Sequence, residues 1–388
     1  MSGQDGMVQE LCTQILRDTH AYTPGTEPRR PTLVANGTPP WRRAASLGRE
    51  RCRDLVERAA ARAGFSHRHF DPDAAAGRLA RLLELSEGLE ATYARLADEA
   101  SRRAMLDLLK LRVLGPYHAR LAITPEQFSA AQAQVERSLR ERPATFEVSD
   151  PWFSPLSLYR IPEPDGEPIR LHAHSVDIVS VYVREQYRYG DVVGAEPGDV
   201  VFDVGGCWGD TALYFARRVG PAGKVYTFEF DPESLGVLRA NLALNPELSQ
   251  RIEVVERALW ERSGEVLRFA QAGRCTTVLG GDGAGSDLEI ETVTLDDFVR
   301  EAGIDRLDLV KMDVEGAELA VLEGARATLA AHAPKLALAA YHKDDDLVRI
   351  PQAIAAAREG YELYLGSFSP VEDETVLFAR ATERSSST

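Results

Sequence analysis

Short apolar segments alternate with amphipathic ones through the second half of this chain. The apolar runs have the length of buried strands, the amphipathic runs have the length of helices, and a glycine-rich turn follows the first apolar run. Strands that alternate with helices in this way predict a parallel sheet with helices on both faces, an α/β doubly wound fold of seven strands. The expected strands are 199–204, 224–230, 252–259, 307–314, 335–342, 361–369 and 375–381, and the expected helices are 209–219, 231–244, 315–332 and 347–358.

Two segments depart from this alternation. Only a short turn separates 361–369 from 375–381, so the final strand is expected to be antiparallel. The segment 264–294 contains GGDGAGSD, which predicts a mobile hairpin or loop near the mouth of the site.

The first half of the chain has a different composition. Residues 19–46 contain five prolines and two glycines, which is typical of a linker, and apolar residues at steps of three and four from Leu85 to Leu111 predict one long helix. We expect a flexible segment and linker at 1–46, a helical N-terminal domain at 47–145, a connecting hairpin region at 146–190, a cofactor-binding domain at 191–382 and a disordered tail at 383–388.

Charge and composition exclude several classes of protein. No apolar run is long enough to span a membrane, the N-terminus has no secretory signal pattern, and the four cysteines form no C-x-x-C pair, so we expect a cytoplasmic protein. The net charge is −15, with 22 basic and 20 acidic residues in 1–150 but 23 and 40 in 151–388. An acidic domain does not suit a nucleic-acid backbone, so a small molecule is the expected partner.

The turn after the first expected strand carries the strongest signal for a ligand. Asp203 ends that strand, and Gly205, Gly206 and Gly209 follow it at the sheet edge where doubly wound folds bind ligands. Glu229 ends the next strand, 26 residues after Asp203, where an acid can accept both hydroxyls of a ribose. This pair predicts an adenosine-type cofactor, either a nicotinamide dinucleotide or S-adenosylmethionine. Asp203 favours the second, because a carboxylate there would repel a pyrophosphate.

Five local patterns stand out in the second half of the chain. They are DVGGCWGDT at 203–211, FEFDP at 228–232 with Asn241 and Asn245, VTLDDF at 293–298, KMDVEGAE at 311–318 followed by VLEG at 321–324, and YHK at 341–343 with Asp346. Together they resemble the FkbM-type family of S-adenosylmethionine-dependent methyltransferases. The resemblance covers residues 185–380, and Glu185-Gln186-Tyr187 before the domain is also similar to longer members. Phe230 departs from the family, where proline often follows the acid.

The resemblance implies a class I, Rossmann-like methyltransferase domain and an O-methyltransferase that acts on a sugar or polyketide-like hydroxyl. It implies that Glu229 binds the ribose, that Ala258 and Leu259 lie along the adenine, and that Asp313 borders the methyl-transfer site. The residues implied to bind the rest of the cofactor are Asp203, Gly205, Gly206, Gly209, Asp210 and Thr211.

Methyl transfer to a hydroxyl gains from a general base as well as from positioning. His342 follows the fifth strand on the same edge as Asp313 and titrates near neutral pH, so it is the candidate base. We expect Glu315 to contact substrate and Glu318 to be structural. No metal ligand is assigned, although Asp313, His342 and Asp344–Asp346 could form a Mg²⁺ site; the acids at 344–346 are more simply the acidic start of a helix.

Several alternatives stay open at this point. His172 and His174 could bind metal or substrate, but two histidines without a third ligand are more often structural. A nicotinamide-dependent oxidoreductase and a non-catalytic binding protein on the same fold are the rival functions, and the N-terminal helices could support a homodimer.

Overall fold

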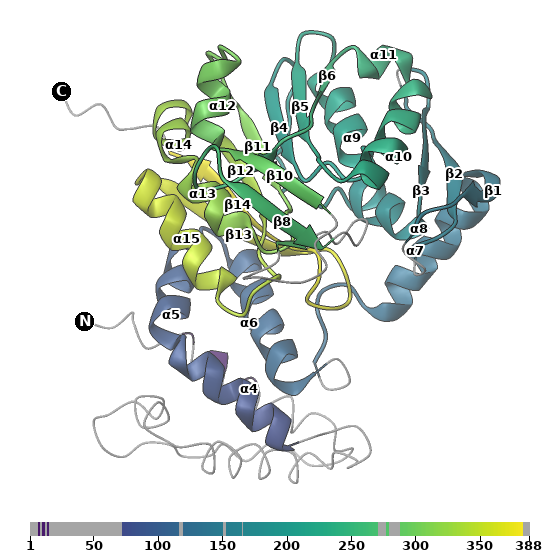
Figure 1. Cartoon of the computed structure of the whole chain (residues 1–388). Coiled ribbons are helices and arrows are strands. Elements are labelled where there is room, and N and C mark those ends of the chain that lie inside the picture. Colours follow the sequence, from purple (N-terminus) through teal and green to yellow (C-terminus); the bar gives the residue numbers. More distant parts are fainter. Residues whose placement is uncertain are drawn as a thin grey trace, which may run out of the picture. The chain divides into compact units, whose positions relative to one another are not determined.

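The chain divides into two compact units in a computed structural model of the protein (Figure 1). One unit comprises residues 1–124 with 370–372, and the other comprises 125–369 with 373–388. The structure describes residues 7, 10, 11, 14, 72–115, 119–149, 153–164, 166–270, 277–278 and 288–382. The expected linker at 19–46 and the tail at 383–388 lie outside the described residues.

The first unit is helical. Its helices are α4 (Pro72–Glu84), α5 (Ser86–Arg95) and α6 (Glu99–Leu114), and Arg112 pairs with Glu372 at 3.0 Å, which attaches 370–372 to this unit. The prediction of one long helix from 85 to 111 is wrong. Asp98 has extended backbone and its carboxylate accepts a hydrogen bond from the Ser101 N–H at 2.8 Å, so it caps a new helix. Among the described residues, no helix combines the length and apolarity that a membrane span requires.

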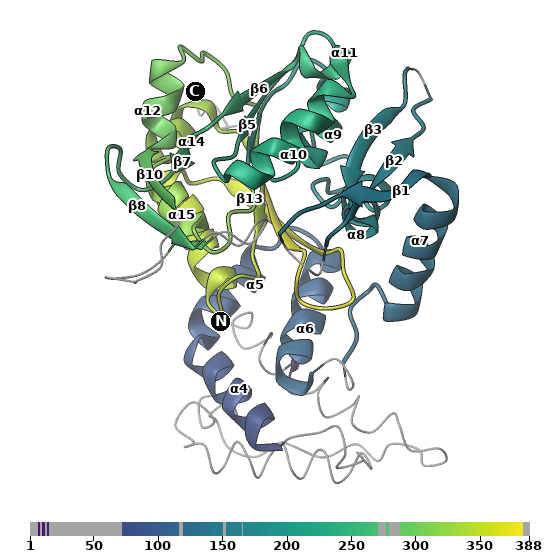
Figure 2. The ribbon, with the colours of Figure 1, turned by 45° about the vertical axis from the view of Figure 1, so that its right-hand side comes forward.

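The second unit begins with α7 (Pro125–Ser138), so its boundary falls before the expected position at 145. The physical reason is packing: α7 contacts the strand and the helical turns that follow it within the same unit. The expected hairpin region is a three-stranded antiparallel sheet, visible in Figure 2, followed by two helical turns. These elements are β1 (Arg140–Phe146), β2 (Leu156–Ile161), β3 (Ile169–Ala173), α8 (Ser175–Asp177) and the π-helix η1 (Ile178–Val183).

The main sheet has seven strands in the order β13-β14-β12-β11-β4-β5-β6. Its first five strands in the chain run parallel, and β14 is antiparallel to both neighbours, which confirms the two predictions. The strands are β4 (Val200–Val204), β5 (Lys224–Phe228), β6 (Ile252–Val255), β11 (Leu309–Met312), β12 (Lys335–Ala339), β13 (Tyr361–Ser367) and β14 (Thr375–Ala381).

Helices cover the two sides of this sheet in separate groups, as Figure 1 shows. The expected helix 315–332 is divided into α13 and α14 at Gly324, where a side chain would overlap the Trp260 carbonyl. One group is α9 (Asp210–Val219), α10 (Pro232–Ala243) and α11 (Pro246–Ser249). The other is α12 (Leu295–Glu301), α13 (Glu318–Glu323), α14 (Arg326–His332) and α15 (Asp346–Ala357).

The part of the chain between β6 and α12 forms a second, smaller sheet. The predicted single strand 252–259 is wrong: β6 ends at Val255, and β7 (Ala258–Leu259) pairs with β10 (Leu288–Val293) in this second sheet. The predicted hairpin is confirmed, because β8 (Val266–Ala270) is antiparallel to β10 and β9 (Thr277–Val278) to β8. GGDGAGSD itself lies outside the described residues.

A buried ion pair joins the two central strands. Lys311 on β11 lies in register with Asp203 on β4, and its Nζ is 3.2 Å from the Asp203 carboxylate. Neither side chain is exposed by more than 2%. The carboxylate also accepts hydrogen bonds from the hydroxyls of Thr211 and Thr227, and Nζ donates to the Gly205 carbonyl at 2.6 Å. Good geometry and added hydrogen bonds are what a buried ion pair needs.

We expect Lys311→Met to lower the free energy of unfolding by about 3–5 kcal/mol, because it leaves the Asp203 carboxylate buried without a cation. Urea unfolding followed by circular dichroism measures this. The matched control is Arg326→Met, which removes the exposed partner of Glu323 and should cost less than about 1 kcal/mol. Equal losses of unfolding free energy in the two variants would contradict a stabilising role for the Asp203–Lys311 ion pair.

Candidate functional site

The turn after β4 passes so close to its neighbours that only glycine fits. Gly205 has φ +83°, and a side chain there would overlap the carbonyl oxygen of Asp313. Gly206 similarly lies against the Thr227 hydroxyl. Gly209 has φ +78° and begins α9. One side of the turn therefore packs closely against β5 and the end of β11, and its outer side is open to a ligand.

The first chamber beside this turn lies at the ends of β4 and β5. It encloses about 700 Å³, including its opening to solvent. One wall is Glu229, and much of the rest is apolar or aromatic. Its lining includes the predicted residues Gly205, Glu229, Ala258, Leu259 and Asp313, together with Phe228, Phe230, Trp260 and Phe269. An aromatic slot with a carboxylate at one side has the chemistry that suits a nucleoside.

Glu229 is held rigidly by backbone N–H groups. Its Oε1 accepts hydrogen bonds from Phe230 at 2.7 Å and Asp231 at 2.8 Å, and its Oε2 accepts one from Cys207 at 2.9 Å. Burial raises the pKa of Glu229 to about 7, although these N–H groups oppose the shift. Oε1 already accepts two hydrogen bonds and Oε2 accepts one, so a lone pair of Oε2 can still accept a ligand hydroxyl.

The second chamber adjoins the first across a shared wall. It encloses about 590 Å³, including its opening, and Gly205, Cys207, Asp313 and Glu315 line both chambers. The predicted residues Asp210 and Thr211 line it as well. Its remaining lining is Asp177, Ser180, Val181, Gln186, Tyr187, Trp208, Lys311, Tyr341 and Glu374.

Asp203 lines neither chamber. The prediction that it contacts the cofactor is therefore corrected. Its side chain is fully buried, and its carboxylate is occupied by Lys311, Thr211 and Thr227. Asp203 thus holds the turn in place instead of meeting the ligand. Gly206 and Gly209 also lie outside both linings and shape the turn from behind.

Asp313 stands where the two chambers meet. The hydroxyl of Tyr187 donates to its Oδ2 at 2.9 Å, and the hydroxyl of Tyr341 lies 3.3 Å from Oδ1. Glu315, two residues later, has φ +53°, a strained conformation for a residue with a side chain. This backbone carries the Glu315 carboxylate to the shared wall.

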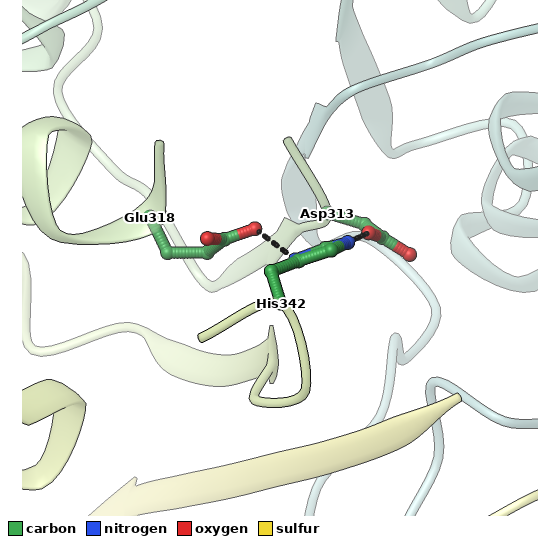
Figure 3. A group of neighbouring side chains, drawn as sticks. All are labelled: Asp313, Glu318 and His342. Carbon is green, nitrogen blue, oxygen red and sulfur yellow. Dashed lines mark ion pairs between the residues drawn. The ribbon is translucent and has the colours of Figure 1, made fainter. Parts of the chain in front are cut away.

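His342 bridges carboxylates, as Figure 3 shows. Its Nδ1 lies 2.9 Å from Glu318 Oε1, and its Nε2 lies 3.6 Å from Asp313 Oδ1 and 3.5 Å from Glu315 Oε2. Glu318 is 1% exposed, and its Oε1 also accepts hydrogen bonds from two backbone N–H groups. Burial lowers the pKa of His342, but the carboxylates of Glu318, Asp313 and Glu315 outweigh it and raise the pKa to about 9.

This pKa corrects the prediction that His342 is the general base. An imidazole with a pKa of about 9 already carries its proton at neutral pH and has no lone pair to take another. His342 also lines neither chamber. Its place between the carboxylates makes it a positioning residue for Asp313 and Glu315, and Glu318 is its buried support, as expected.

The same three residues bear on a metal site. Asp313, Glu318 and His342 offer ligand atoms within 4.8 Å of one another. The two carboxylates, however, lie at opposite nitrogens of one ring (Figure 3), so a cation bound to either nitrogen faces away from the other carboxylate. The arrangement therefore suits an ion-pair network better than Mg²⁺, which prefers oxygen ligands in octahedral geometry.

The remaining candidates have structural partners. Asp346 accepts a hydrogen bond from the Lys343 N–H at 2.7 Å at the start of α15. His174 caps α8 through Nδ1, which accepts from the Val176 N–H at 3.3 Å. His172 contacts the Phe146 ring, with ring centres 5.0 Å apart, and burial lowers its pKa.

Sequence reasoning gave no role to several residues of the site. Lys311 is the clearest, although a lysine inside the apolar run LDLVKMDV is itself a signal that its charge is paired. Ser180 and Tyr187 come from one segment, Phe269 and Tyr341 come from two others far along the chain, and only the fold brings the three segments together.

The strand order, the sealed glycine turn and the acid at the end of β5 define a class I, Rossmann-like methyltransferase fold. Residues 193–363 match the model of the methyltransferase FkbM domain. This match confirms the resemblance to the FkbM-type methyltransferases over the residues that it covers.

Two curated relatives are similar to this domain. The 2-O-methyltransferase NoeI of Sinorhizobium fredii is 28% identical over 152 residues, which cover 34% of this chain and 60% of the relative. The 31-O-demethyl-FK506 methyltransferase FkbM of Streptomyces tacrolimicus is 32% identical over 166 residues, 35% of this chain and 62% of the relative. The chain thus spans less than two thirds of the length of these relatives.

A crystal structure of methyltransferase FkbM from Methylobacillus flagellatus is also similar. Its TM-score is 0.49 and its sequence identity 19%, over 85% of this chain and 69% of that one. The fold of this chain is therefore assigned from its own strand order.

We expect the imidazole of His342 to stay protonated up to about pH 9, and Glu318→Gln to lower that pKa by removing its nearest carboxylate. Because the folded pKa lies above the unfolded value near 6.5, the charge on His342 stabilises the fold fully below about pH 6.5. That contribution is lost as the pH rises through 9. An NMR titration, with the imidazole signals assigned by comparison with His342→Gln, measures the pKa of His342 in the wild type and in Glu318→Gln. Titration of wild-type His342 near pH 6.5 would refute the ion-pair network.

Proposed function

We propose that this protein is an S-adenosylmethionine-dependent O-methyltransferase that acts on a hydroxyl of a small molecule. The observation that carries this proposal is a pair of chambers that meet at Asp313 and Glu315, the first ending in an anchored carboxylate, Glu229. A nucleoside cofactor suits the first chamber, and the shared wall is where a group attached to that nucleoside would meet an acceptor. The matching family domain supports the same reaction class.

Residues of the first chamber suit the cofactor in three ways. Glu229 would accept a ribose hydroxyl, Ala258 and Leu259 would lie along the adenine, and Gly205 permits close approach of the ligand to the backbone. When bound, S-adenosylmethionine supplies an electrophilic methyl group on a positively charged sulfur. The carboxylates at the shared wall have the sign of charge that stabilises such a cation.

The chain's own contribution to the reaction lies with Asp313 and Glu315. Both face the two chambers, and we infer that they orient the acceptor hydroxyl and take up its proton. The imidazolium of His342 lies within 3.6 Å of both carboxylates, which limits their repulsion and fixes their positions.

The acceptor we propose is a sugar or a polyketide-like compound. Support comes from the relatives, one named as a 2-O-methyltransferase and one as a methyltransferase of 31-O-demethyl-FK506. The lining of the second chamber has more carboxylates than cations, which disfavours an anionic acceptor.

The first experiment is calorimetric titration with S-adenosylhomocysteine and, separately, NAD. Binding of the first and not the second supports the proposal. Binding of NAD alone would favour an oxidoreductase, and binding of neither by folded protein would favour a non-catalytic role.

Glu229→Gln should lower the affinity for S-adenosylhomocysteine at least tenfold at pH 8, since a hydrogen bond to a charged group contributes about 1.5–3 kcal/mol. In the wild type the affinity should rise from pH 6 to pH 8 as Glu229 loses its proton near pH 7, whereas the variant should show no such rise. Exposed Glu256→Gln is the control. An unchanged pH dependence in Glu229→Gln would count against Glu229 as the ribose ligand.

Glu315→Gln and Asp313→Asn should reduce the rate of methyl transfer about 10²- to 10⁴-fold while affinity for S-adenosylhomocysteine stays within about threefold. The rate is measured as release of S-adenosylhomocysteine with a hydroxylated acceptor found by screening sugars and polyketides. Glu323→Gln, on the exposed surface of α13, should leave the rate unchanged. Losses below tenfold in both variants would exclude these carboxylates as proton acceptors.

A further inference from the structure

Two asparagine side chains attach the outer edge of β3 to the end of α10, which lies beside it (Figure 2). Asn241 accepts a hydrogen bond from the His172 N–H at 2.7 Å and donates one to the His172 carbonyl at 2.9 Å. Asn245 pairs with the N–H and carbonyl of Arg170 in the same way, at 3.0 and 2.6 Å. An amide side chain has the donor and acceptor of a peptide group, so the two asparagines take the place of a neighbouring strand.

One of the two asparagines also contacts the glycine turn. Asn241 is fully buried, and its Nδ2 donates a second hydrogen bond to the Trp208 carbonyl at 2.9 Å. The corresponding hydrogen of Asn245 goes to the backbone carbonyl of Asn241 at 2.7 Å. Each side chain therefore makes three hydrogen bonds, and the third bond of Asn241 joins the three-stranded sheet to the turn.

The segment that Asn241 holds has an unusual backbone. Trp208 lies between Cys207, with φ +43°, and Gly209, with φ +78°. A left-handed conformation at a residue with a side chain costs about 1–3 kcal/mol and persists only where neighbouring groups fix it. In this conformation the Cys207 N–H donates to Glu229 Oε2 at 2.9 Å. An interaction that fixes Trp208 therefore also fixes a donor that orients Glu229.

The ring of Trp208 is attached to the same sheet. Trp208 is 2% exposed, and the Phe153 ring lies 6.1 Å away in an edge-to-face arrangement. The other buried members of this cluster are Val148, Leu156 and Val237. Leu156 begins β2, and Val148 and Phe153 belong to the connection between β1 and β2. The sheet and its connection thus hold this turn residue at its ring as well as at its carbonyl.

We propose that Asn241 is a positioning residue for cofactor binding, which links the docking of the three-stranded sheet to the conformation of the glycine turn. The inference rests on the proposed function, because it acts through Glu229 as a ligand of the cofactor. The three strands precede the matched family domain, so cofactor binding by that domain depends on a segment outside it. Because coupling between two sites is reciprocal, the bound cofactor must in turn stabilise the pairing of Asn241 with β3.

The first test compares Asn241→Leu with its matched control Asn245→Leu, since each variant removes three hydrogen bonds. Calorimetry should show that Asn241→Leu lowers the affinity for S-adenosylhomocysteine by about fivefold or more, whereas Asn245→Leu stays within about twofold of the wild type. When Glu229 is already replaced by Gln, Asn241→Leu should have a much smaller effect, because the two residues act on one contact. Equal losses in the two single variants, or a full additive loss in the double variant, would overturn the positioning role.

A measurement on the wild type keeps the proposal testable if Asn241→Leu does not fold. Saturating S-adenosylhomocysteine should slow hydrogen exchange of the His172 N–H, which is bonded to Asn241, by about fivefold or more. The N–H of Leu109, buried in α6 of the helical unit, is the control and should change much less. Slowing at His172 that is no greater than at Leu109 would overturn the coupling. Failure of the wild type to bind S-adenosylhomocysteine would instead overturn the proposed function, which separates the two failures.

Discussion

The buried pair of Asp203 and Lys311 is the interaction on which the site depends. It joins β4 to β11 at the centre of the sheet, and each partner extends to another part of the same edge. Lys311 holds the Gly205 carbonyl, while Asp203 holds Thr211 at the start of α9 and Thr227 on β5. These contacts join the glycine turn, the start of α9 and the ends of two strands into one rigid unit. Both chambers lie against this unit. A site placed on such a framework needs little reorganisation when a ligand binds.

A second network sets the electrostatics of the shared wall. Three carboxylates surround the imidazolium of His342, and two tyrosine hydroxyls donate to or lie beside Asp313. Glu318 is fixed by backbone N–H groups, so the network is anchored in the protein on the side away from the chambers. One positive charge among three negative ones leaves a net negative wall. That charge has the sign that suits a sulfonium cofactor.

Most of the fold follows from the alternation of apolar and amphipathic runs, because buried parallel strands and surface helices differ strongly in pattern. The failures have local causes: Asp98 caps a new helix inside a continuous apolar stripe, and the chain between Val255 and Ala258 leaves one sheet for another. The position of Glu229 at a strand end was enough to locate it in a chamber. The same reasoning misjudged Asp203, because sequence places a side chain at a strand end but does not reveal which polar groups it meets.

The protonation state of His342 is another property that the sequence alone does not reveal. Its position and its ordinary pKa both favour a base, yet three carboxylates of the segment 313–318 raise its pKa to about 9 and keep it protonated at neutral pH. Such sums depend on tertiary contacts, and so does the lining of the second chamber by Ser180 and Gln186. Both residues precede the matched domain, and it is the packing of η1 against α9 that brings Ser180 to the edge of the sheet. A sequence pattern confined to the strands and their turns therefore cannot identify every residue that lines the site.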